Sequence, residues 1–130
     1  MVKNRLTHNP LQDIRQVVKR EELILLQEDT RRVFIHEDLI DYIVTLVDMT
    51  RHHEQIETGA SPRATLAVTS LSKAISMIND RDYVIPEDIR MAYLKALPHR
   101  IRLKADAEIR GVTAESLLNG ILKKTAPPKI

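Results

Sequence analysis

Two stretches of this 130-residue chain place apolar residues at every third or fourth position, a spacing typical of one face of an α-helix. The first covers about residues 37–53, and its stripe consists of Leu39, Ile43, Leu46 and Thr50. Ile40 and Val47 widen this stripe. In the second, the stripe is Ala64, Val68, Leu71, Ile75 and Ile78. Ala67 and Ala74 flank this second stripe, and small residues let neighbouring helices approach closely. We therefore expect the two stripes to face each other in a helical bundle.

Two proline-containing sites mark where helices begin. Ser61 can cap a helix with its hydroxyl, and Pro62 then occupies the first helical position, where its missing N–H costs no hydrogen bond. Pro86 is followed by two acids, residues 87–88, which are favourable in a first turn because the helix N-terminus carries partial positive charge. The sequence thus predicts one helix from Pro62, and another from Pro86 to near Pro98.

Two further helices are predicted from charge order and capping. Over about residues 20–32, acids at 21–22 precede arginines at 31–32, which is the order that the helix dipole favours. Thr113 can cap a last helix over about 114–124. Its apolar residues fall on one face: Leu117, Leu118, Ile121 and Leu122.

The segments between these helices are short. Residues 33–35 are β-branched or aromatic and predict an extended connector, whereas residues 52–59 have no period and predict a loop. Residues 99–112 alternate charged and apolar side chains, which is compatible with a short strand before Gly111. The predicted fold class is all-α: a bundle of about five helices with short extended connectors.

Composition excludes several kinds of chemistry. The chain has no cysteine, so disulfides, thiolate zinc sites and thiol nucleophiles are absent. None of its three glycines opens a phosphate-binding loop of the P-loop or dinucleotide type. We therefore expect that this chain does not hold the phosphates of a nucleotide by itself.

Three candidate metal motifs are incomplete. His36 begins a pattern like a zinc-protease helix, but Ile40 stands where the second histidine is needed. Asp80 and Asp82 resemble the first ligands of a calcium loop that lacks its later ligands and glycine. The adjacent histidines 52–53 point to different faces of a helix end and are interpreted as ordinary polar residues. The sequence predicts no metal ligand and no catalytic residue in this chain.

Charge varies along the chain although the net charge is only +2. Residues 1–20 carry +4, residues 21–58 carry −7, residues 59–94 are neutral and residues 95–130 carry +5. Such asymmetry suits docking to a partner, although a solvated surface of mixed sign is the simpler interpretation.

No apolar run reaches the roughly 18 residues of a membrane helix, and no signal peptide is recognisable. The expectation is a soluble, cytoplasmic protein without membrane contact.

Five blocks, in this order and spacing, carry a resemblance to a known family. They are Tyr42-Ile43-Val44-Thr45-Leu46-Val47, Thr50-Arg51-His52, Gly59-Ala60-Ser61-Pro62-Arg63-Ala64, Arg81-Asp82-Tyr83-Val84-Ile85-Pro86-Glu87-Asp88 and His99-Arg100-Ile101. Together they closely resemble the C-terminal helical lid of MoxR-type AAA+ ATPases, over about residues 10–128.

The resemblance implies a role for Arg63. The arginine of the matching block in that family is the sensor-2 residue, which reaches the phosphates of ATP bound by the core domain. Ser61 would support it as the helix cap. A guanidinium at a helix start suits an anion, because it adds a permanent charge to the positive end of the helix. The alternative is that Arg63 pairs with an acid of residues 21–58.

The resemblance also implies what lies around this chain. Residues 1–18 would link the lid to an ATPase core preceding Met1, residues 19–126 would form the lid, and residues 127–130 a tail. That core would bind most of the ATP and its magnesium ion. The intact protein would be an ATP hydrolase, a ring-forming homo-oligomer and a chaperone in the assembly of other proteins.

Two features depart from the family pattern or compete with it. Lys19 and Ile85 stand where the family usually has a serine or threonine cap, which places those two caps in question. The rival hypothesis is a free-standing helical module that binds protein or DNA through its basic terminal segments. An aromatic content of 3% and the lack of a helix with clustered lysines and arginines argue against nucleic acid.

Overall fold

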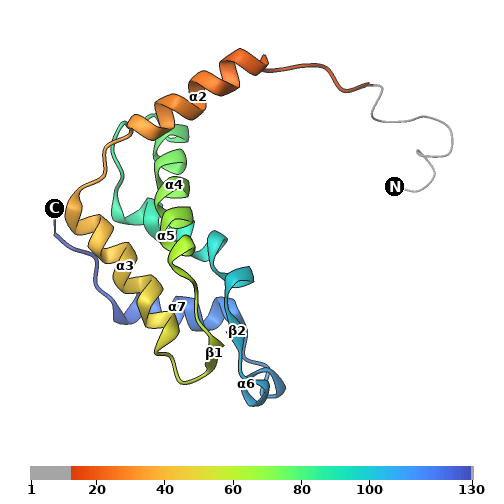
Figure 1. The fold of residues 1–130 in the computed structure, drawn as a ribbon, viewed down its shortest axis with the longest axis vertical. Coiled ribbons are helices and arrows are strands. Elements are labelled where there is room, and N and C mark those ends of the chain that lie inside the picture. The colour runs from red at the N-terminus through yellow and green to blue at the C-terminus, as the bar shows by residue number, and fades with distance from the viewer. Residues whose placement is uncertain (1–12, 130) are drawn as a thin grey trace.

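The computed structural model describes residues 13–129, which form a helical bundle with one small antiparallel sheet (Figure 1). The helices are α2 (Arg20–Arg32), α3 (Glu37–Arg51), α4 (Pro62–Ile78), α5 (Pro86–Ala96), the 3-10 helix η2 (Pro98–Arg100), α6 (Ala105–Ile109) and α7 (Ala114–Lys124). The strands are β1 (Ile56–Thr58) and β2 (Arg102–Leu103). The predicted all-α fold with short extended connectors is confirmed. Within this part of the chain, no helix is long and apolar enough to cross a membrane.

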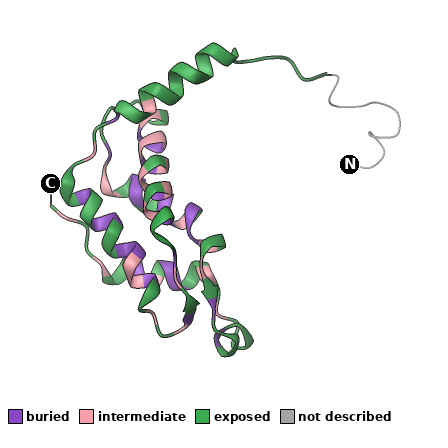
Figure 2. Cartoon of the chain, in the orientation of Figure 1, coloured by how far each residue is buried: buried purple, intermediate pink, exposed green. Residues whose placement is uncertain are grey.

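The main core lies between α3, α4, α5 and α7, where buried faces turn toward one another (Figure 2). The predicted stripe of α3 is fully buried: Leu39, Ile43, Leu46 and Thr50. From α4, Ala64, Val68 and Ile75 enter the same core. The other helices add Ile89, Ala92, Tyr93, Leu118 and Ile121. The expected contact between the stripes of α3 and α4 is therefore confirmed for most of its length.

Three residues assigned to the stripes differ from expectation. Ile78 is 81% exposed and Ile40 is 38% exposed, and Leu71 is only half-buried against the core. Ile78 is the last residue of α4 and lines a cavity together with residues of α2. Helical spacing predicts a face correctly but does not show where a neighbouring helix stops covering it.

Helix α2 has the predicted bounds but lies outside the core. It crosses the C-terminal end of α4 and buries none of its residues (Figures 1 and 2). Its contacts with α4 include a Thr30 hydroxyl 3.1 Å from the Met77 sulfur and a hydrogen bond of 3.1 Å from Lys73 Nζ to the Arg31 carbonyl. A short cavity between the two helices is lined by Leu23, Leu26 and Ile78, among others.

One strand of the small sheet, β1, lies where the sequence predicts a loop. β1 pairs antiparallel with β2, and Ile56 is opposite Leu103. Both side chains pack with Leu117 in a second, smaller core. The loop predicted over residues 52–59 is therefore wrong for three of its residues. The partner strand of β1 is remote in sequence, so no local pattern of residues predicts the pairing.

The region 99–112 is more varied than the predicted short strand. Only Arg102–Leu103 are extended and paired, and the next residues form α6. This helix has five residues and buries Ala107. Gly111 then adopts φ 77, a left-handed conformation that glycine adopts without strain, as the chain turns toward α7. A helix this short gives too few apolar repeats to be recognised from sequence.

The two departures at helix starts are compensated by acids one turn later. The Lys19 amide donates to Glu22 Oε2 at 2.7 Å, and the Ile85 amide donates to Asp88 Oδ2 at 3.0 Å. Each carboxylate thus satisfies a backbone donor at the start of its helix, α2 or α5. These helices begin where predicted without a serine or threonine cap.

Candidate functional site

Arg63 is the second residue of α4 and is exposed to solvent. The first turn of α4 contains no acid, in contrast to α2, α3, α5 and α7, whose first turns contain one or two. The positive end of this helix dipole is therefore not compensated by its own side chains. Residues 21–58 are all described, and none of their acids forms an ion pair with Arg63. The alternative of an internal partner in that segment is not supported.

Ser61 takes the N-cap position of α4 but not the expected hydrogen bond. Its backbone is extended, with φ −73 and ψ 165, and its hydroxyl makes no capping contact. The Ala64 amide, a natural target for that hydroxyl, donates instead to the Ser61 carbonyl at 2.8 Å. The predicted capping position is correct, and the predicted hydroxyl contact is wrong. The exposed hydroxyl stands two residues before Arg63.

The loop that leads into α4 returns to the end of α3 and is held there. The Ala60 amide donates to Thr50 Oγ1 at 2.9 Å, and that hydroxyl donates to the Val47 carbonyl at 2.6 Å. Arg51 Nε donates to the Ala60 carbonyl at 2.9 Å. Both backbone polar groups of Ala60 are therefore bound by adjacent residues of α3. Helical spacing predicts Thr50 as part of the core stripe but gives no sign of this contact.

A buried ion pair lies near the other end of α4. Arg81 Nη2 is 2.6 Å from Asp88 Oδ1, and Arg81 Nη1 is 2.7 Å from Asp88 Oδ2. Asp88 is almost fully buried, and its hydrogen bond to the Arg81 side chain is the main cause of the raised pKa of Arg81. Nearby, the buried Ser76 hydroxyl contacts the carbonyl oxygens of Arg81 and Tyr83 at 3.0 and 2.8 Å. This cluster fixes the chain between α4 and α5.

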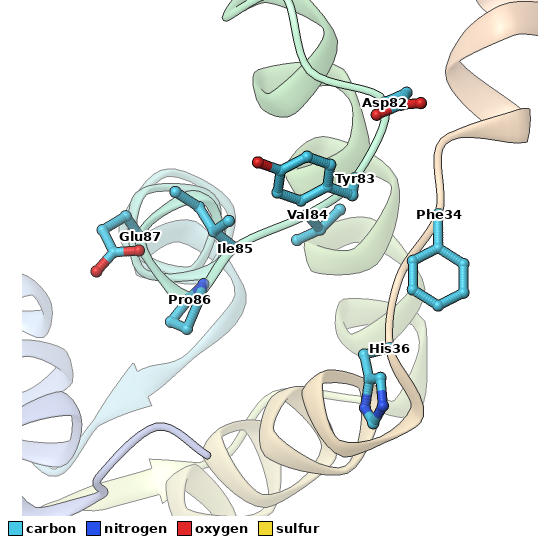
Figure 3. A pocket seen from close by; sticks show the side chains of 8 residues that line it. All are labelled: Phe34, His36, Asp82, Tyr83, Val84, Ile85, Pro86 and Glu87. Atoms are coloured by element: carbon cyan, nitrogen blue, oxygen red, sulfur yellow. The ribbon is translucent and has the colours of Figure 1, made fainter. Parts of the chain in front are cut away.

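A cavity of about 630 Å³ opens beside this connection (Figure 3). Phe34 and His36 lie on one wall, ahead of α3, and Tyr83 and Pro86 lie on the other. The two walls are joined by backbone hydrogen bonds: the Phe34 amide donates to the Asp82 carbonyl, and the Val84 amide donates to the Phe34 carbonyl. The 17 residues of α4 span about 25 Å, so this cavity is separated from Arg63 by the length of that helix. The two features are therefore distinct places on the molecule.

Potential metal ligands do not cluster among residues 13–129: no group of three or more histidine or acidic side chains could hold an ion there. His52 Nε2 lies 3.4 Å from Asp48 Oδ2, and His53 Nδ1 accepts a hydrogen bond from the Gln55 amide at 3.2 Å. Asp80 adopts φ 55 in the turn after α4. His52 and His53 thus make local contacts, and Asp80 lies in a turn.

Comparison with known proteins gives consistent matches. A family model described as "AAA lid domain" matches residues 48–121. The uncharacterized protein YeaC of Bacillus subtilis is 32% identical over 120 residues, which cover 92% of this chain and 38% of YeaC. Chaperone MoxR1 of Mycobacterium tuberculosis is 33% identical over 125 residues, covering 89% of this chain and 33% of MoxR1. This chain thus spans between 33% and 38% of the length of these curated relatives.

A solved structure has the same fold. The crystal structure of a candidate ATPase from Cytophaga hutchinsonii superposes with a TM-score of 0.86 at 30% sequence identity, covering 98% of this chain and 42% of that one. The helical fold and the match over residues 48–121 show that the chain belongs to the AAA lid domain family. Within that family it is a lid of the MoxR type of AAA+ ATPase.

Proposed function

We propose that this lid contributes Arg63, as a sensor-2 arginine, to the phosphates of ATP held by an ATPase core. The observation that carries the proposal is the exposed Arg63 at the acid-free start of α4. An arginine in this position adds a fixed charge to a helix end that already favours anions. Its planar guanidinium matches two phosphate oxygens at once. The residues present therefore fit one strong contact to a phosphate group.

One contact does not make a nucleotide site. The described residues offer neither a phosphate-binding loop nor a cluster of acids for magnesium. We infer that ATP and magnesium are bound mainly by the core, and that the lid closes over the nucleotide. Closure would bring Arg63 to the γ-phosphate, and hydrolysis would remove the partner that holds the lid closed. The chain alone is expected neither to bind ATP tightly nor to hydrolyse it.

We propose further that the intact protein is an ATP hydrolase that acts as a cytoplasmic, chaperone-like assembly factor. The name of MoxR1 describes that relative as a chaperone, and family membership favours a ring-forming homo-oligomer. The proposed linker, residues 1–18, would join the lid, residues 19–126, to the core, and residues 127–130 would form a tail. Residues 1–12 and residue 130 of these segments lie outside the described residues. The match to the AAA lid family model and the similarity to MoxR1 favour this proposal over the rival hypothesis of a free-standing interaction module.

Kinetics of the full-length ATPase test the role of Arg63. Arg63→Ala should lower kcat by about 10- to 150-fold, because a charge-assisted hydrogen bond contributes about 1.5–3 kcal/mol. Arg63→Lys should recover only part of the rate, since an ammonium cannot bind two oxygens in one plane. Arg90→Ala is a matched control, because Arg90 is also exposed on a helix and lacks an ion pair among residues 13–129. Wild-type turnover in Arg63→Ala would contradict the proposal.

A further inference from the structure

We propose that Thr50, Arg51 and Gly59 position Arg63 by locking the loop before α4 onto the end of α3. These three residues are called the α3 latch below. The inference rests on the proposed role of Arg63, which it extends to residues that do not touch the nucleotide. They would act as positioning residues, by fixing where α4 begins and which way its first turn faces.

Thr50 is the buried part of the latch. Its side chain is 0% exposed, and its hydroxyl both accepts from the Ala60 amide and donates to the Val47 carbonyl. A polar group in such a place is costly unless it is hydrogen-bonded, and here both of its contacts are satisfied. A valine at this position would keep the shape and leave the Ala60 amide without its partner. The hydroxyl therefore has a hydrogen-bonding role that core packing alone does not require.

Gly59 lets the two segments approach closely enough for these bonds. A Cβ added to Gly59 would lie 2.6 Å from Arg51 Cα and 2.7 Å from Arg51 N, distances at which the backbone has to move. Both contacts are to the α3 backbone, so no side-chain rotation relieves them. The Arg51 side chain then crosses the loop and donates to the Ala60 carbonyl. The close approach at Gly59 and the hydrogen bonds of Ala60 thus favour the same arrangement of the loop against α3.

The latch lies directly before the proposed phosphate contact. Ala60 carries two of its hydrogen bonds and precedes Arg63 by three residues, one of which is Pro62 with its restricted φ. With Ala60 fixed and Pro62 rigid, little freedom is left in the path to the first turn of α4. A displacement of about 1 Å in a group that contacts a transition state is enough to lower a rate markedly. Loosening the latch should therefore lower turnover without removing Arg63.

Paired substitutions at Thr50 separate this role from simple packing. Thr50→Val keeps the volume and loses the hydroxyl, whereas Thr50→Ser keeps the hydroxyl and loses a methyl group. A packing role predicts that the serine variant is the worse of the two. The latch predicts the reverse, with Thr50→Ser close to wild type. Gly59→Ala should behave like Thr50→Val, and Gly120→Ala is its control because an added Cβ there meets no atom within 4 Å.

The test is hydrogen exchange of the nucleotide-free, full-length ATPase, read by mass spectrometry on peptides covering residues 56–66, together with kcat. Thr50→Val and Gly59→Ala should speed exchange in these peptides by about tenfold or more and lower kcat by at least about tenfold. Thr50→Ser and Gly120→Ala should match wild type in both. Unchanged exchange across α5 in each variant shows that the fold is intact.

Each other outcome has a defined meaning. Unchanged exchange in both Thr50→Val and Gly59→Ala overturns the latch. Faster exchange with unchanged kcat also overturns the positioning role if Arg63→Ala lowers kcat in the same assay. If Arg63→Ala is itself without effect, the proposed function fails while the latch stands as a structural feature.

Discussion

Asp88 combines a helix cap and an ion pair in one buried side chain. Its two oxygens accept from both outer nitrogens of Arg81, and one of them also accepts from the Ile85 amide. The carboxylate therefore joins the turn after α4 to the start of α5. From sequence, Asp88 is predicted only as a first-turn acid that suits the helix dipole, because the position of Arg81 opposite it depends on the fold of the turn.

Removing this carboxylate should destabilise the protein clearly. Asp88→Ala removes both Asp88 contacts of the Arg81 guanidinium, which keeps its hydrogen bond to the Tyr83 carbonyl, and leaves the Ile85 amide without its partner. We expect a loss of about 2 to 3 kcal/mol in the free energy of unfolding. Asp106→Ala is the control: it breaks the exposed Asp106–Arg110 pair of 2.9 Å and should cost less than about 1 kcal/mol. Denaturant melts of both variants check the difference. Equal losses would show that burial of Asp88 does not matter.

Tyr93 gives the protein a predictable sensitivity to alkali. Burial raises the pKa of its phenol above the ordinary value of 10.0, and the hydroxyl donates to the Leu46 carbonyl at 3.2 Å. Below pH 10 the phenol is protonated in both states, so stability does not depend on it. Above pH 10 the unfolded chain loses this proton and the folded chain retains it, so stability falls as pH rises. Burial also raises the pKa of Tyr42.

Tyr93→Phe should remove part of this dependence. Between pH 10 and 11 we expect the wild-type free energy of unfolding to fall by up to about 1 kcal/mol more than that of Tyr93→Phe, since one proton corresponds to about 1.4 kcal/mol per pH unit. Urea melts at the two pH values measure the slopes. Parallel slopes for wild type and variant would mean that Tyr93 ionises normally in the folded state.

At the scale of elements, local signals predicted the helices well. Charge order predicted α2, proline predicted the starts of α4 and α5, and Thr113 predicted the start of α7. The Thr113 hydroxyl oxygen accepts a hydrogen bond from the Ser116 amide at 3.1 Å. The strand β1 and helix α6 were missed for different reasons, whereas β2 lies within the region predicted as a short strand. The sheet needs a partner far along the chain, and α6 is shorter than two helical turns. Exposure of Ile78 also depends on neighbours that spacing does not show.

The contact between α3 and α4 can be tested by comparing buried and exposed positions of the two stripes. Leu46→Ala should cost about 2–5 kcal/mol, because Leu46 is fully buried in the main core. Ile78→Ala should change stability by no more than about 0.5 kcal/mol, because its side chain is 81% exposed. Denaturant melts measure both changes in the free energy of unfolding. A small loss in Leu46→Ala would contradict the described core.

At the scale of the whole molecule, the bundle presents Arg63 at one end of α4 and attaches α2 at the other (Figure 1). The sequence predicted Arg63 and Ser61 as the candidate site through resemblance to a family, and the location of Arg63 on an exposed helix start suits that role. Its role as a phosphate contact stays a prediction, because the phosphate would be held by another domain. The α3 latch was not predicted, since the contacts of Thr50 and Gly59 exist only after the loop has folded.

We propose that Arg63 binds the γ-phosphate when the lid closes. This contact can be checked in a crystal structure of the full-length ATPase with magnesium and a non-hydrolysable ATP analogue. We expect the Arg63 guanidinium within about 3 Å of γ-phosphate oxygens, the usual distance of a charge-assisted hydrogen bond. A closed lid over bound nucleotide, with Arg63 paired elsewhere and the γ-phosphate contacted only by core residues, would contradict the account.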